Sequence, residues 1–126
     1  MSANEDRRLV RLTKLCLALP EVTREMNGPH ATFRVRKKTF AWYLDDHQGD
    51  GIVGLVCKTA RGENQTWVNS DPTHFYMPAY VAHRGWLGIR LDVGGIDWDE
   101  LTGFVRDSYC LTAPKTLAAQ VRGRRP

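Results

Sequence analysis

The sequence has no long hydrophobic run, and this absence argues against a membrane-spanning helix. No stretch approaches the ~20 consecutive apolar residues that a transmembrane helix needs. Residues 2–8 are polar and charged, without the apolar segment of a secretory signal. The sequence therefore predicts a cytoplasmic protein with no membrane partner.

Cysteine is scarce, and the recognisable catalytic and metal-binding motifs are missing. Cys16, Cys57 and Cys110 are widely spaced among apolar neighbours, a pattern typical of buried structural thiols. The four histidines form no His-x-x-x-His pair, and no Cys-x-x-Cys or Glu-x-x-His motif occurs. No serine lies in a Gly-x-Ser-x-Gly elbow, and no glycine-rich phosphate loop is present. We therefore expect no enzyme activity, no metal site and no cofactor.

Excess positive charge is also missing from the body of the protein, although the net charge is +4. Residues 1–40 carry nine Lys and Arg against four Asp and Glu, and residues 41–121 carry six against ten. The three arginines of residues 122–126 supply the rest. The length predicts one domain over 1–121, followed by a basic, disordered tail at 122–126. A useful positive field therefore requires clustering of cations on one face.

Apolar residues at helical spacing predict three helices and a short fourth one. The first helix covers 4–19 and ends at Pro20. A weaker pattern predicts a second helix over 60–70. Asp97 begins the last long helix, because a glutamate three residues later has capping-box spacing. A short helical turn follows within 114–121.

Alternating side chains predict five strands and complete the fold class. The expected strands are 32–36, 39–44, 52–58, 75–81 and 86–91. Lys37 and Lys38 form a short turn between the first two strands, and short links favour antiparallel pairing. The order helix, three strands, helix, two strands, helix predicts an α+β two-layer sandwich. Its single antiparallel sheet carries the helices on one face.

The other face of the sheet is the candidate binding surface. If Phe40 and Trp42 point into the core, alternation turns Arg34 and Tyr43 away from it. Cations interleaved with aromatic rings suit phosphate contact and base stacking. The alternative is a solvated strand face whose charges protect the sheet. The candidate nucleic-acid-binding residues are Arg34, Arg36, Lys37, Lys38, Tyr43, Lys58, Arg84, Trp86, Arg90 and Lys115.

A second group of aromatic residues allows a different interpretation. Its members are Trp67, Phe75, Tyr76, Tyr80 and Trp86. Such rings either fill the core or line a groove for a protein partner or a small ligand, and an open apolar cleft would distinguish the two. An enzyme would require His30, His74 or His83 to meet a carboxylate in space.

Several stretches resemble the MmcQ/YjbR family of small bacterial proteins. The similarity extends over residues 8–120 and includes 19–23, 32–35 and 38–41. Its most distinctive parts are Pro78-x-Tyr80-Val81-x-His83-Arg84-Gly85-Trp86 and Ser108-Tyr109-x-Leu111-x-Ala113-Pro114-Lys115. The hairpin turn departs from the family pattern, because Arg36-Lys37-Lys38 stands where a glycine is usual.

The resemblance implies an α-β3-α-β2-α fold similar to secretion-chaperone-like and frataxin-like sandwiches. Members of the family are commonly described as DNA-binding through a double-wing arrangement, and they offer no catalytic residues to carry over. Our leading hypothesis is therefore a non-enzymatic DNA-binding domain of low sequence specificity. The alternative is a protein- or small-ligand-binding adaptor with an aromatic groove near 75–86. The oligomeric state stays open.

Overall fold

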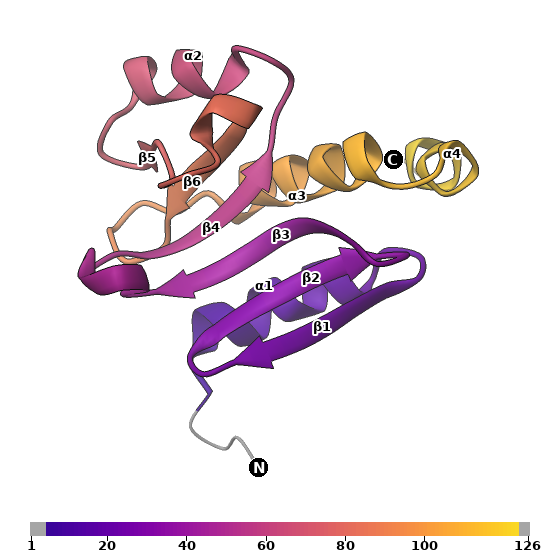
Figure 1. Cartoon of the computed structure of the whole chain (residues 1–126), viewed down its shortest axis with the longest axis horizontal. Helices are drawn as coiled ribbons and strands as arrows, with labels where there is room; N and C mark the ends of the chain where they lie inside the picture. The colour runs from indigo at the N-terminus through magenta and orange to yellow at the C-terminus, as the bar shows by residue number, and fades with distance from the viewer. Residues whose placement is uncertain (1–4, 124–126) are drawn as a thin grey trace.

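The computed structural model describes residues 5–123 and confirms the α+β class (Figure 1). The helices are α1 (Arg7–Leu17), α2 (Glu63–Ser70), α3 (Trp98–Thr112) and α4 (Lys115–Gly123), with short 3-10 turns η1 (His47–Gly49) and η2 (Ala82–Arg84). The strands are β1 (Val22–Asn27), β2 (His30–Val35), β3 (Lys38–Asp45), β4 (Val53–Lys58), β5 (Phe75–Tyr76) and β6 (Trp86–Arg90). They form one antiparallel sheet in the order β1-β2-β3-β4-β6-β5. Helices α1 and α3 lie behind it, and we call the opposite side the free face.

The two long helices begin at side-chain caps. Asp6 accepts a hydrogen bond from the Arg8 backbone at 2.8 Å, so α1 begins later than predicted. Asp97 accepts hydrogen bonds from the backbones of Asp99 at 3.0 Å and Glu100 at 3.1 Å, which confirms the predicted start of α3. Each cap satisfies backbone donors that a helix otherwise leaves unpaired.

Helix α3 is fixed to the sheet through its C-terminal half. Ser108 is buried, and its hydroxyl donates to the Phe40 carbonyl at 2.5 Å and accepts from the Lys58 backbone at 2.8 Å. The Tyr109 ring packs edge-on against Phe40, with centroids 5.5 Å apart. The Tyr109 hydroxyl donates to the Pro20 carbonyl at 2.7 Å. These contacts tie β3, β4 and the end of α1 to one helix.

Strand β1 is a correction to the predicted element order, and it adds a sixth strand. Its side chains are mostly exposed, because it lies at the edge of the sheet. Backbone pairing with β2 holds this strand in the sheet. It was not predicted because its sequence lacks the alternation of apolar and polar residues by which the other strands were identified. The predicted strand 75–81 is also shorter: only Phe75 and Tyr76 pair with β6, and the chain then leaves the sheet.

A bulge reverses the predicted orientation of two aromatic residues. The register of β2 and β3 shifts between Phe33 and Arg34, which leaves Phe40 as an extra residue in β3. Alternation therefore changes phase after Phe40. Tyr43 points into the core and is 1% exposed, whereas Trp42 points to the free face. The placement of Tyr43 on a nucleic-acid-binding surface is thus wrong.

The turn between β2 and β3 uses two residues that rarely adopt its geometry. Arg36 and Lys37 have φ of 49° and 71°, as a two-residue type I′ hairpin requires. Glycine and asparagine are usual there because a Cβ is strained at positive φ. The Arg36 guanidinium donates to the Glu21 carboxylate at 2.7 Å. The predicted turn is present, but its two central residues are Arg36 and Lys37 and not Lys37 and Lys38. Charged side chains therefore lie at the tip of the hairpin.

Two of the three cysteines are buried in the core. Cys16 and Cys57 are buried and unbonded, Cys110 is half-buried, and burial raises the pKa of Cys57 to about 12. The predicted burial is confirmed for Cys16 and Cys57. Helix α4 includes Arg122, where a tail was expected, and residues 124–126 of that tail lie outside the described range. No helix within 5–123 is long and apolar enough to cross a membrane.

Candidate functional site

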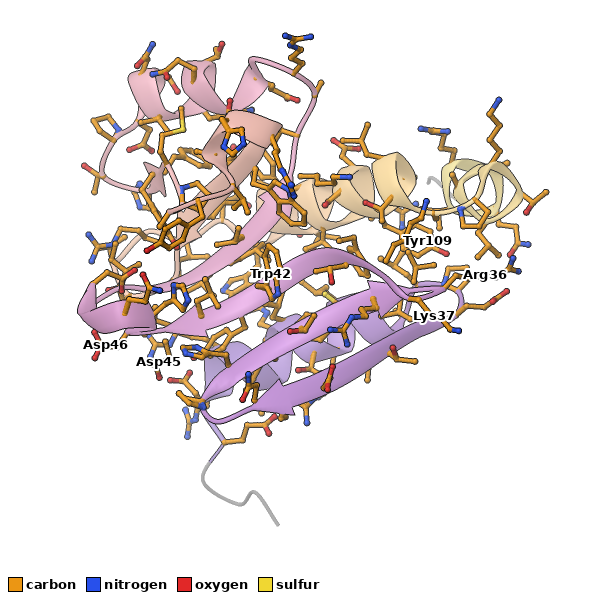
Figure 2. The ribbon with its side chains drawn as sticks, in the orientation of Figure 1. Arg36, Lys37, Trp42, Asp45, Asp46 and Tyr109 are labelled. Carbon is orange, nitrogen blue, oxygen red and sulfur yellow. The ribbon has the colours of Figure 1, made fainter. Side chains whose placement is uncertain are left out.

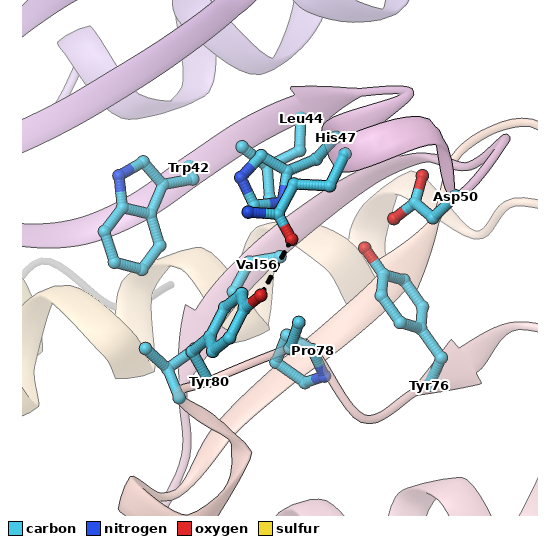
Figure 3. Close-up of a pocket in the computed structure, with 11 residues that line it drawn as sticks. Trp42, Leu44, His47, Asp50, Val56, Tyr76, Pro78 and Tyr80 are labelled. Carbon is cyan, nitrogen blue, oxygen red and sulfur yellow. Dashed lines mark hydrogen bonds between the residues drawn. The ribbon is translucent and has the colours of Figure 1, made fainter.

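A pocket opens on the free face, where the chain after β5 passes over the sheet. Asn64 holds this passage in place, since its side-chain amide donates to the carbonyls of Ala82 at 2.8 Å and Trp86 at 2.9 Å. The hollow has a volume of about 410 Å³, and we call it the Trp42 pocket (Figure 3). It is lined by Trp42, Leu44, His47, Gln48, Asp50, Val56, Tyr76, Pro78, Ala79, Tyr80 and Val81.

Two glycines let Tyr76 lie against the sheet and form one side of the pocket. A Cβ at Gly88 would lie 2.4 Å from Cζ of Tyr76, and a Cβ at Gly54 would lie 2.5 Å from its hydroxyl. Any larger side chain would therefore push the ring off β4 and β6. Burial raises the pKa of Tyr76, so its hydroxyl stays protonated at neutral pH.

Trp42 forms another side of the pocket and is backed by a second indole. The Trp42 and Trp86 rings are 4.7 Å apart and tilted by 35°. Lys58 places its Nζ 5.9 Å from the Trp86 ring centroid, at the limit of a cation–π contact. Because Trp86 is only 5% exposed, its ring supports Trp42 and presents almost no surface to a base. The predicted stacking role of Trp86 therefore does not fit its position.

Tyr80 and Gln48 close one side of the pocket by a direct bond. The Tyr80 hydroxyl donates to Oε1 of Gln48 at 3.0 Å, as the dashed line in Figure 3 marks. Both residues have positive φ, 69° for Tyr80 and 55° for Gln48. Such a conformation costs roughly 1–2 kcal/mol per residue outside glycine. Tyr80 nevertheless remains 73% exposed, so little burial offsets the strain. Backbone strain of this kind is common at ligand sites.

The polar edge of the pocket comes from the loop between β3 and β4. Oδ1 of Asp50 accepts from the Ile52 backbone at 2.9 Å, and Oδ1 of Asp46 accepts from the Gly51 backbone at 2.7 Å. These bonds fix the loop conformation. Asp50 is the only Asp, Glu, Lys or Arg among the lining residues, so the pocket carries negative charge at one edge.

Ion pairs neutralise three of the eight cations on the predicted nucleic-acid surface. Three of its arginines pair with carboxylates: Arg34 with Glu25, Arg36 with Glu21 at 2.7 Å, and Arg90 with Asp92 at 2.8 Å. Exposed pairs of this kind contribute little to stability, yet they cancel the local field that would attract phosphate. The exposed sheet surface is therefore less basic than its sequence suggested.

The other predicted cations gather toward the hairpin end of the sheet. Lys38 begins β3, Lys58 ends the antiparallel β4, and Arg84 lies just before β6, so these three share that end. Lys37 lies at the tip of the hairpin beside Arg36 (Figure 2), and Lys115 starts helix α4. Within residues 5–123 none of these five side chains forms an ion pair.

Two of the histidines make local structural contacts. His74 meets a carboxylate, as the enzyme interpretation required, because its Nδ1 lies 2.9 Å from Oδ2 of Asp71. Its Nε2 lies 2.7 Å from the Gly94 carbonyl, so both ring nitrogens are engaged within the fold. Nδ1 of His30 accepts from the Asp45 backbone at 3.1 Å. Among the described residues, no group of three or more His, Cys, Asp and Glu side chains gathers as a metal site would require.

The fold and this hollow define a small α+β domain with a ligand-sized pocket on the free face of its sheet. The model of the YjbR family matches residues 17–111, so the protein belongs to that family. Its fold is similar to that in the crystal structure of Deinococcus radiodurans protein DR2400, a protein with the family-model domain DUF419. That similarity has a TM-score of 0.67 at 19% identity, over 82% of this chain and 76% of the other. No curated protein matches the sequence.

Part of the pocket follows from the sequence. The sequence predicts Tyr76 and Tyr80 as members of an aromatic groove, whereas it places Trp42 in the core and gives no role to Gln48 and Asp50. One signal was present in the sequence: Gly54 and Gly88 interrupt apolar strands. Glycine inside a strand often marks a place where another group approaches the backbone closely. Here that group is the Tyr76 ring.

Proposed function

We propose that the protein is a non-enzymatic binding protein for a small organic ligand held in the Trp42 pocket. The observation that carries the proposal is a hollow of about 410 Å³ bounded by aromatic side chains. Ligand pockets typically measure about 300–1,000 Å³ and combine an apolar lining with a few polar groups. Leu44, Val56 and Pro78 supply apolar lining, and Gln48 and Asp50 supply polar atoms that would orient a ligand.

The expected affinity follows from the surface that the pocket removes from water. Burying about 200 Å² of apolar ligand surface contributes about 5 kcal/mol at ~25 cal/mol per Å². Lost translational and rotational freedom offsets part of this gain. A ligand that fits the pocket without specific polar contacts should therefore bind in the high-micromolar range or more weakly.

A neutral fluorescent probe tests this function. When the full chain is titrated up to about millimolar concentration into a fixed, low concentration of N-phenyl-1-naphthylamine, the fluorescence enhancement should saturate. Ala79→Phe, which fills the pocket from its exposed loop, should abolish the enhancement. The matched control is Ala119→Phe on the exposed side of α4, which should leave binding unchanged. Absence of saturable binding, or equal loss in both variants, would contradict the proposal.

A second candidate function is DNA binding of low sequence specificity through the hairpin end of the sheet. The specific observation in its favour is that Lys37 and Lys38 lie exposed at a hairpin tip, without ion-pair partners among residues 5–123. Two such contacts to phosphate would make binding weak and steeply dependent on salt. The family description of DNA binding agrees with this proposal.

Duplex titrations at several salt concentrations test the second candidate. Lys37→Gln/Lys38→Gln should weaken binding and lower the salt slope by up to about two, one for each lost phosphate contact. Arg7→Gln, at the start of α1, is the control and should change little. Retained affinity and slope in the double variant would remove the hairpin end as the binding surface.

A further inference from the structure

Three aromatic side chains surround the Trp42 pocket from different elements. Trp42 comes from β3, Tyr76 from β5, and Tyr80 from the passage that follows it. Figure 3 shows Trp42 and Tyr76 on opposite sides, with Tyr80 between them, and Asp50 near the hydroxyl of Tyr76. Aromatic faces carry negative electrostatic potential, and a carboxylate adds to it. This combination favours a positively charged guest.

Among the residues that line this space, no lysine or arginine competes with a cationic guest. The lining contains neither lysine nor arginine, and its only titratable base is His47. Arg90 lies near Tyr76, but its guanidinium donates to both carboxylate oxygens of Asp92, at 2.9 and 2.8 Å. Asp50 and Asp92 both raise the pKa of Tyr76, although burial is the larger cause. An anionic ligand would meet repulsion here and find no counter-charge.

The edge of the pocket offers few acceptors that lack a donor. Oε1 of Gln48 accepts from Tyr80 and Oδ1 of Asp50 accepts from the Ile52 backbone, whereas Oδ2 of Asp50 has no donor among residues 5–123. A primary ammonium needs up to three acceptors to replace its water, more than this one carboxylate oxygen supplies. A methylated ammonium carries the same charge without N–H donors, and it gains from aromatic faces directly.

We propose that the Trp42 pocket selects an organic cation of the quaternary ammonium class attached to an apolar body, a specificity that rests on the small-ligand function proposed above. The cationic group lies among Trp42, Tyr76 and Tyr80, with Asp50 as its counter-charge. The apolar body covers Val56 and Pro78. Cation–π contacts supply the preference for charge, and the enclosed apolar surface supplies the rest of the affinity.

Two isosteric probes isolate the contribution of charge. (3-Hydroxyphenyl)trimethylammonium and 3-tert-butylphenol have the same shape, because a quaternary nitrogen replaces a quaternary carbon. Calorimetric titration of the full chain should show the cation binding about tenfold more tightly. Asp50→Asn keeps an oxygen for the Ile52 backbone, and it should weaken the cation severalfold while leaving the phenol unchanged.

Each outcome separates the specificity from the underlying function. Equal or tighter binding of the phenol overturns the preference for cations and leaves a small-ligand pocket. Binding of N-phenyl-1-naphthylamine without binding of the cation has the same consequence. Failure of all three probes overturns both proposals. An Asp50→Asn effect that is equal for both isosteres would show that the carboxylate acts through loop structure, which removes it as the counter-charge.

Discussion

Gly88→Ala tests the close contact that forms one side of the pocket. The added Cβ would lie 2.4–2.6 Å from three atoms of the Tyr76 ring. Carbon atoms in good contact are about 3.5–4.0 Å apart, so the ring must move by roughly 1 Å or more. Overpacking of this kind costs about 1–3 kcal/mol. The displaced ring would also enter the pocket and weaken binding of N-phenyl-1-naphthylamine.

The measurement is urea unfolding of Gly88→Ala, alone and combined with Tyr76→Ala. If the Tyr76 ring is the obstacle, the cost of the alanine should largely disappear in the Tyr76→Ala background, with a coupling of about 1–3 kcal/mol. Gly103→Ala in α3 is the matched control. Its Cβ would meet nothing within 4 Å, so it should stabilise the helix by about 0.5–1 kcal/mol.

Two results would refute this reasoning. Gly88→Ala with wild-type stability would mean that the ring does not lie against β6. A cost that persists at full size without the Tyr76 ring would mean that glycine is required at this position for another reason. In either case the Tyr76 side of the pocket would not have the geometry on which both ligand proposals depend.

Three further substitutions test the fold at other points. Lys37→Gly should raise the free energy of unfolding by up to about 1 kcal/mol, because it relieves a positive φ of 71°, whereas Lys38→Gly in the adjoining strand should lower it by about 0.5–1 kcal/mol. Ser108→Ala should cost about 2–4 kcal/mol, because the buried Phe40 carbonyl and the part-buried Lys58 N–H lose this partner, whereas exposed Ser70→Ala should change the free energy by less than about 0.5 kcal/mol. Contacts with the Gly94 carbonyl and Asp71 raise the pKa of His74, so its stabilising effect is complete below the unfolded value of 6.5 and is lost as pH rises through the folded value. The stability advantage of wild type over His74→Gln, measured by chemical unfolding, should therefore be larger at about pH 5.5 than at about pH 8.5.

The helices were predictable from sequence because their signals are local. The cap at Asp97 and the apolar stripe of α3 lie within a few turns of chain, and the structure confirms both. The short helical turn predicted within 114–121 is likewise present as part of α4, which buries Leu117 and Val121. Element class and order along most of the chain follow from such patterns.

Features that depend on neighbouring strands were not predictable in the same way. The bulge at Phe40 arises from the pairing of β2 with β3, and it exchanges the faces of Trp42 and Tyr43. Strand β1 has no apolar alternation and forms because β2 offers backbone partners. The pocket depends on both effects and on a chain passage over the free face, so its residues come from separate parts of the sequence.

The charge surface shows the same limit. Arg34 looked available for phosphate when only its own strand was considered, but the register of β1 places Glu25 within ion-pair distance. Lys37 lies at a turn and has no such neighbour among residues 5–123, so its exposure follows from local sequence. Lys37 is therefore without an ion-pair partner within 5–123, whereas carboxylates in β1 and just before it, Glu25 and Glu21, supply the counter-charges of Arg34 and Arg36.

The most direct test of the ligand pocket is the NMR response of the four indole N–H groups during titration with (3-hydroxyphenyl)trimethylammonium. Trp42 lines the pocket and Trp86 packs 4.7 Å behind it, whereas Trp67 packs on Phe75 and Phe104, and Trp98 packs under Arg11. The account predicts a large saturable shift for Trp42, a smaller one for Trp86 with the same Kd, and none for Trp67 or Trp98. Saturable shifts at Trp67 or Trp98 with Trp42 unchanged would contradict it.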